Sequence, residues 1–189
     1  MRSMFVVLSL SLMVFLAACS NKTTMPTQPS TSVSSVTNWT KYGFPTVLDS
    51  VNITPGTPDS IVSGPYNIQI PGNVFAAPVE FELLSGDTNT FVAKAPSGET
   101  PILAFAFKVI DIKTDTLVGE FQNPLTITVN DPEITTGSWY YNIYSDGTYA
   151  LNSTGMKLSQ GQLIHPIKGA LYGWVVTAPT SSGGGGYGY

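Results

Sequence analysis

The sequence is poor in the side chains on which most metal sites and many active sites depend. It contains one cysteine and one histidine, and only 11% of its residues are charged, against about 25% in average proteins. A single cysteine excludes an intrachain disulfide, and a single histidine excludes a zinc site built on several histidines. The formal net charge is −4, without the basic stripe that nucleic-acid binding requires, so we expect no nucleic-acid partner.

Long apolar runs are also missing, except at the N-terminus. There, Arg2 precedes an uncharged and mostly apolar segment, Met4 to Leu16, which small residues follow. This order is typical of a secretory signal. The apolar segment is too short to span about 30 Å of hydrocarbon as a permanent helix. We therefore expect export from the cytoplasm.

The cysteine stands directly after this segment, in the string Leu16-Ala17-Ala18-Cys19. The string resembles the lipobox of bacterial lipoproteins. The resemblance implies transfer of diacylglycerol to the Cys19 thiol, cleavage before Cys19 and acylation of the new amine. The membrane would then be a partner through lipidated Cys19. Ser20 is not aspartate, which resembles the outer-membrane sorting pattern, if the host is diderm. The alternative is a plain signal peptide with an accidental cysteine.

The chain as a whole divides by composition into four parts. Residues 1–18 form the expected signal peptide, and residues 19–37 a lipidated tether rich in Ser, Thr and Pro. The 18 residues of the tether from 20 to 37 reach at most about 60 Å when extended. Residues 38–178 are the expected folded domain, and residues 179–189 a flexible tail of glycine and tyrosine.

Hydrophobic residues in the expected domain alternate with a period of two. The pattern recurs in five segments rich in β-branched and aromatic residues, at 79–83, 103–109, 125–129, 139–144 and 171–176. Ile102 and Ile110 make the second face of one segment apolar too, as in a central strand. Turn residues separate the segments, and Asp146-Gly147 is the best candidate for a tight hairpin. The sequence therefore predicts an all-β fold, an antiparallel sandwich that is immunoglobulin-like or related, with an up-and-down barrel as second choice.

A second resemblance lies in the stretch Ile68-Gln69-Ile70-Pro71-Gly72, which is followed by Phe75 and by Pro78-Val79. A strand that ends in Ile-Pro-Gly, a turn carrying Phe and a strand opening on Pro-Val is similar to the β-sandwich domain shared by ankyrins and netrin receptors. Some bacterial surface proteins carry similar modules. The resemblance implies an interaction and force-bearing element, and it carries over no functional residue.

Aromatic residues gather in the C-terminal third of the domain. Because side chains of a strand alternate between two faces, about half of these residues should point outward. We expect a binding surface for glycan or protein among Tyr140, Tyr144, Tyr172 and Trp174. The alternative is that these rings fill the core.

Residues suited to catalysis are few. His165 lies in an apolar run, where we expect a strand residue with a satisfied ring nitrogen. Glu80 and Glu82 lie two residues apart on one strand face, which we expect to be the solvated one. Glycoside hydrolysis requires two carboxylates, so a secreted hydrolase remains an alternative.

Acidic loop ends provide the remaining candidate chemistry. Asp111 and Asp115 bracket one turn, and Asp131 and Glu133 flank Pro132. Such groups can bind Ca²⁺, but Asp-rich turns also form without a metal. We predict no catalytic residue, no metal site and no cofactor.

These observations favour a non-catalytic, lipid-anchored protein of the cell envelope, with its domain outside the cytoplasm. It would bind protein or glycan, or serve as a structural part of a surface assembly. A carboxylate-dependent hydrolase and a periplasmic carrier of a small ligand are the alternatives.

Overall fold

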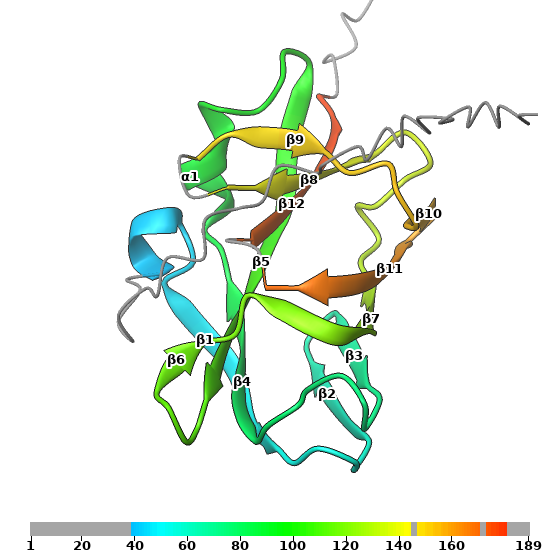
Figure 1. Ribbon diagram of the computed structural model, residues 1–189. Helices are drawn as coiled ribbons and strands as arrows, with labels where there is room; N and C mark the ends of the chain where they lie inside the picture. The colour runs from blue at the N-terminus through cyan, green and yellow to red at the C-terminus, as the bar shows by residue number, and fades with distance from the viewer. Residues whose placement is uncertain (1–38, 145–146, 171–172, 181–189) are drawn as a thin grey trace, which may run out of the picture. The chain divides into compact units, whose positions relative to one another are not determined.

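The computed structural model describes residues 39–144, 147–170 and 173–180. Two antiparallel sheets in this part of the chain pack together as a β-sandwich (Figure 1). The first sheet contains, in spatial order, β1 (Thr46–Ile53), β4 (Val79–Ser85), β5 (Glu99–Asp111), β12 (Gly173–Pro179), β8 (Trp139–Ile143) and β9 (Tyr149–Leu151), with β6 (Thr116–Leu117) beside β5. The second sheet contains β10 (Lys157–Ser159), β11 (Gln162–Gly169), β7 (Glu120–Asn130), β3 (Tyr66–Ile70) and β2 (Asp59–Ser63). The predicted all-β sandwich is confirmed.

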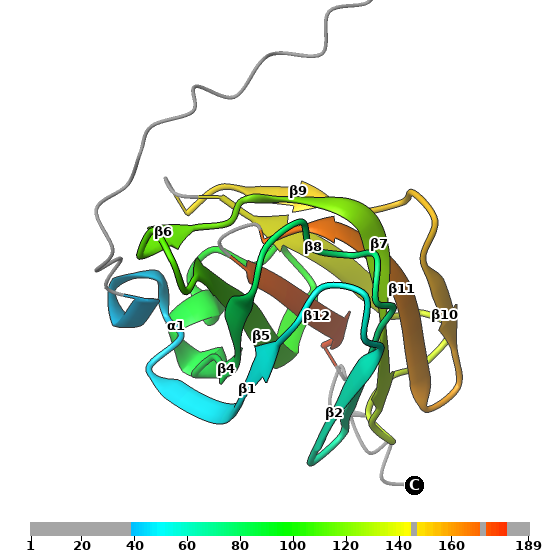
Figure 2. The same ribbon diagram turned by 60° about the horizontal axis from the view of Figure 1, so that its bottom comes forward.

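The alternating segments of the sequence correspond to the strands β4, β5, β7, β8 and β12. In Figure 2, β1, β4 and β5 lie on one side of the sandwich, and β7, β11 and β10 on the other. The predicted hairpin is also present, because β8 and β9 pair as antiparallel neighbours with Ile143 opposite Tyr149. The Tyr144 N–H donates to the Thr148 carbonyl, at 3.2 Å, and the Gly147 N–H donates to the Tyr144 carbonyl, at 2.8 Å, so the hairpin is closed by the three residues 145–147 and not by a tight two-residue turn at Asp146-Gly147. Gly147 has a φ of 77°, the left-handed conformation typical of the last residue in a three-residue loop, and Asp146 lies outside the described residues.

The space between the sheets is filled by large apolar side chains. Phe105 and Phe107 of β5 are fully buried, and their rings lie 5.3 and 5.0 Å from that of Trp174 on β12. Ile127 of β7 and Leu163 of β11 close the core from the second sheet. Burying side chains of this size contributes about 1.5–3 kcal/mol each, so this layer supplies most of the driving force for folding.

The outer face of the first sheet is covered as well. A 3₁₀ helix, η1 (Trp39–Tyr42), and a short α-helix, α1 (Thr88–Val92), lie against it. Phe44 and Phe91 bury the small and β-branched side chains that β5 and β12 present on this face. The second apolar face of β5 is thereby explained, since this central strand is covered on both sides.

Local sequence explains why α1 forms although the chain shows no sustained helical period. Asp87 precedes the helix in an extended conformation, and its carboxylate accepts a hydrogen bond of 3.0 Å from the Asn89 N–H. Aspartate is a favoured N-cap because it satisfies a backbone donor that the first turn leaves free. At five residues, α1 is too short to show a helical period.

Two strands lie at open sheet edges next to each other, β1 in the first sheet and β2 in the second. The carboxylate of Asp49 accepts a hydrogen bond of 2.8 Å from the Ser50 N–H, and that of Asp59 one of 2.7 Å from the Ser60 N–H. Charged groups at strand edges oppose the addition of further strands.

Within the described ranges, no helix is both long and apolar enough to cross a membrane.

Candidate functional site

Two of the four aromatic residues predicted to form a binding surface lie in the core instead. Tyr140 and Trp174 are 0% and 1% exposed and belong to the core between the sheets, so the prediction that they face outward is wrong. Side chains alternate between two faces on β8 and β12 as predicted, but the face that carries Tyr140 and Trp174 points between the sheets. The opposite face carries Tyr141 and Val175, and these residues are buried too.

The other predicted site residues have different outcomes. Tyr144 follows β8 and is 36% exposed, so it remains a surface residue. Cys19 and Tyr172 lie outside the described residues, and their predicted roles stay predictions.

His165 on β11 is buried opposite Tyr140 of β8. The Tyr140 hydroxyl lies 3.1 Å from His165 Nδ1, so the ring nitrogen is satisfied as expected. Burial lowers the pKa of His165 from 6.5 to about 4 and raises that of Tyr140 well above 10. At neutral pH both groups are therefore uncharged, and the tyrosine hydroxyl can donate to the neutral imidazole. The pair links the two sheets within the core.

The two carboxylates that a hydrolase would use contact different partners. Both oxygens of Glu82 accept hydrogen bonds from Lys108 Nζ, at 2.9 and 3.0 Å. Glu80 lies 3.5 Å from the hydroxyl of Ser50 on the neighbouring strand. This pattern is typical of the outer face of a sheet, where paired charges stay in contact with water.

The acidic loop ends form hydrogen-bonded turns. Asp111 accepts hydrogen bonds from the N–H groups of Lys113 and Thr114, and these bonds lower the pKa of its carboxyl. Asp131 accepts one from the Glu133 N–H. Among the described residues, no three His, Cys, Asp or Glu side chains gather closely enough to hold a metal ion.

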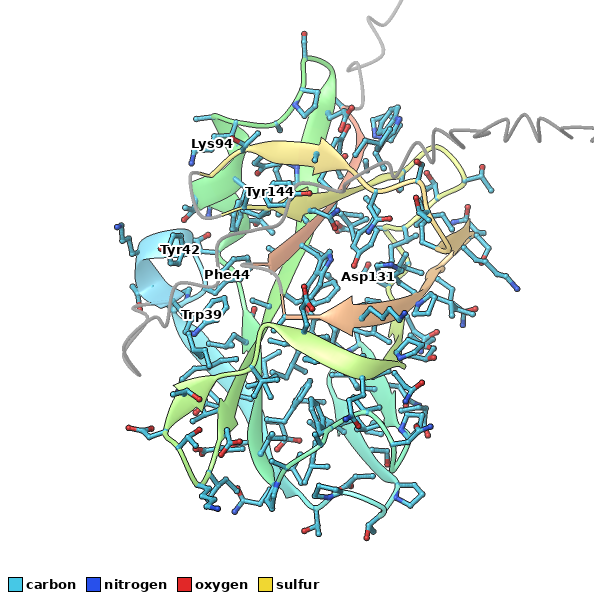
Figure 3. All side chains as sticks on the ribbon, in the orientation of Figure 1. Trp39, Tyr42, Phe44, Lys94, Asp131 and Tyr144 are labelled. Carbon is cyan, nitrogen blue, oxygen red and sulfur yellow. The ribbon has the colours of Figure 1, made fainter. Side chains whose placement is uncertain are left out.

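A cavity lies where η1, α1 and the turn after β8 meet. It has a volume of about 190 Å³, and its lining includes Lys41 and Tyr42 of η1, Phe91 and Lys94 at the end of α1, and Ile143 of β8. Figure 3 shows Tyr42, Lys94 and Tyr144 on the same side of the domain. We call this site the lysine cavity.

Hydrogen bonds hold the walls of the lysine cavity together. The Tyr149 hydroxyl on β9 donates to the Phe91 carbonyl, at 3.1 Å, and so ties α1 to the β8–β9 hairpin. The Asp87 N–H donates to the Gly43 carbonyl, at 3.0 Å, and ties α1 to the segment after η1. Sequence reasoning missed this site because its lysines are separated by more than 50 residues, and neither stands in a recognisable motif.

Searches of protein-family models and of curated proteins found no match to this chain. The two resemblances described above therefore stay predictions.

Proposed function

We propose that the protein is a lipid-anchored, non-catalytic component of the cell envelope that binds glycan or protein or serves as a structural part of a surface assembly. The observation that carries the proposal is the single cysteine of the chain, in Leu16-Ala17-Ala18-Cys19, with a polar tether between it and the domain. Two or three acyl chains on one cysteine anchor a protein stably, and the tether separates the domain from the lipid headgroups.

The arrangement of the described residues favours binding over turnover. Of the side chains suited to a hydrolase, His165 is buried against Tyr140, and Glu82 is paired with Lys108. None of these residues lines the lysine cavity. The space between the sheets is filled by aromatic and aliphatic side chains, which disfavours the alternative of a carrier that encloses its ligand there.

Anchoring is tested by fractionating cells that express the wild-type protein, Cys19→Ala or Ser20→Ala. The wild type and the Ser20→Ala control should appear in the membrane fraction. Cys19→Ala should be soluble or retain its leader. The intact mass of the wild-type protein should show an acylated Cys19, and a mature N-terminus on an unmodified residue would refute the anchor.

Absence of turnover is tested on envelope glycans and proteins. The purified protein should retain at least one of these components in a binding assay and should release no product from the glycans. Product release that disappears in His165→Ala or Glu82→Gln would instead establish the hydrolase.

A further inference from the structure

The lysine cavity concentrates positive charge in an acidic protein. The chain has 8 Lys and Arg residues against 12 Asp and Glu, yet two lysines line this one cavity. Lys108 of β5, by contrast, is paired with Glu82. Within the described residues, no carboxylate lies within ion-pair distance of Lys41 or Lys94. Two ammonium groups in one cavity repel each other and attract an anion.

Aromatic and apolar side chains line the cavity together with the two lysines and Thr90. Lys41 Nζ lies 5.7 Å from the centroid of the Tyr42 ring, a cation–π distance. Tyr42 is partly exposed, and Phe91 and Ile143 complete the lining. An aromatic surface offers flat apolar area to a ligand, and tyrosine adds a hydroxyl for a polar contact. The ligand that fits such walls is itself amphipathic, with a flat apolar face and a negative group.

The size of the cavity limits this ligand. Its 190 Å³ is less than the about 300–1,000 Å³ typical of pockets for drug-sized molecules, so it suits one ring with its substituents. Its walls come from three segments that hydrogen bonds hold together. A pre-formed site of this kind loses little entropy when the ligand binds.

We propose that the lysine cavity binds a single carboxylate-bearing sugar residue of an anionic glycan. Lys41 and Lys94 pair with the carboxylate, and the Tyr42 ring packs against the face of the sugar. Exposed Tyr144 beside the cavity contacts the next sugar of the chain. This assignment rests on the proposed function, and it specifies the glycan class that the envelope protein binds.

An anionic membrane surface is the main competing partner for two lysines. The site is concave and lined by aromatic rings, whereas a membrane surface is flat and attracts extended polybasic segments. The predicted tether also lets the domain stand away from the headgroups. Both observations favour a glycan.

The test uses the purified full-length protein in neutral detergent, with a short oligogalacturonate and a short oligoglucuronate as probes. Binding is measured by calorimetry against the methyl esters of the same oligosaccharides, which keep the rings and lose the charges. At least one acid should bind, its ester should bind about tenfold more weakly or worse, and added salt should weaken the binding of the acid.

The double variant Lys41→Gln, Lys94→Gln should lose about tenfold or more in affinity for the acid. Lys157→Gln is the matched control, because Lys157 is equally exposed but lies on β10 in the second sheet. Thermal melting checks that both variants are folded, as expected for exposed lysines.

Asp146, next to Gly147 of the cavity lining, lies outside the described residues. Asp146→Asn removes a negative charge and should bind at least as tightly as the wild type.

Four results would overturn the assignment: equal affinity for acid and ester, unchanged affinity in the double variant, weaker binding by Asp146→Asn, or no binding of either acid. In the last case, binding to vesicles that contain phosphatidylglycerol, lost in the double variant, would identify a membrane contact instead. The proposed function fails separately, if the protein is not anchored or turns over its ligand.

Discussion

The buried pair of His165 and Tyr140 should make the stability of the domain depend on pH in a specific window. The pKa of His165 is about 4 in the folded protein and about 6.5 in an unfolded chain. At pH 7.5 and above, the ring is almost entirely neutral in both states and contributes little pH dependence. As the pH falls below 6.5, the unfolded chain takes up a proton that the folded domain does not, so the free energy of unfolding decreases down to about pH 4.

The size of the effect follows from these two pKa values. Each pH unit within the window corresponds to about 1.4 kcal/mol. The free energy of unfolding then falls by about 3 kcal/mol over the full titration, and about 2 kcal/mol of this decrease has already occurred at pH 5. The ring is 7% exposed, so residual contact with water reduces these figures somewhat. A loss of 2 kcal/mol is a large fraction of the about 5–15 kcal/mol by which domains are stable.

The assay is urea unfolding followed by tryptophan fluorescence, at pH values from 7.5 to 4.5, for the wild type and His165→Gln. Glutamine does not titrate and can still form a hydrogen bond with the Tyr140 hydroxyl. Because His165 is the only histidine, the difference between the two proteins isolates its titration from that of the carboxylates.

The wild type should lose about 2 kcal/mol relative to His165→Gln between pH 7.5 and pH 5. Parallel pH profiles for the two proteins would refute the reasoning, as would a wild type that gains stability on acidification. Tyr140→Phe is a second probe of the same pair. It leaves a buried ring nitrogen without its partner and should cost about 1–3 kcal/mol at neutral pH.

Three further predictions concern the packing of the first sheet. Phe105→Ala should lower the free energy of unfolding by about 3–5 kcal/mol in urea titrations, because the side chain is fully buried; a loss below 1 kcal/mol would contradict its position in the core. Gly173→Ala should lower Tm strongly, because the added Cβ collides with a buried phenylalanine ring, whereas Gly119→Ala meets open space and should change Tm little. Lys108→Ala should cost about 1 kcal/mol in the wild type and less in a Glu82→Gln background, where no partner charge is left behind; an equal loss in both backgrounds would exclude the ion pair as its cause.

Strands were predictable where the alternation of side chains along the sequence was sufficient to identify them. Alternation at 79–83 and 103–109 indicates strands because a pleated chain sends successive side chains to opposite faces, whatever it packs against. The apolar second face of the latter segment also indicated a central strand, as β5 proved to be. Short elements such as η1 and α1 leave no such pattern, since four and five residues make little more than one turn each.

Alternation alone could not show which face of a strand points into the core and which points to water. On β8 and β12 both faces are buried, one by the second sheet and the other by η1 and α1. An aromatic residue then fits either face, so Tyr140 and Trp174 could be assigned to the surface although they belong to the core. Hydrophobicity distinguishes an inner from an outer face only where one face meets water.

The sequence by itself therefore determined the β-sandwich class, because strands leave a repeating pattern in the chain. The leader and the cysteine signature also depend on residues close together in the chain, and they stay predictions. The lysine cavity was decided by the tertiary structure alone. Lys41 and Lys94 meet because η1 and α1 both cover the outer face of the first sheet. That meeting depends on contacts between segments far apart in the chain, for which no local pattern exists.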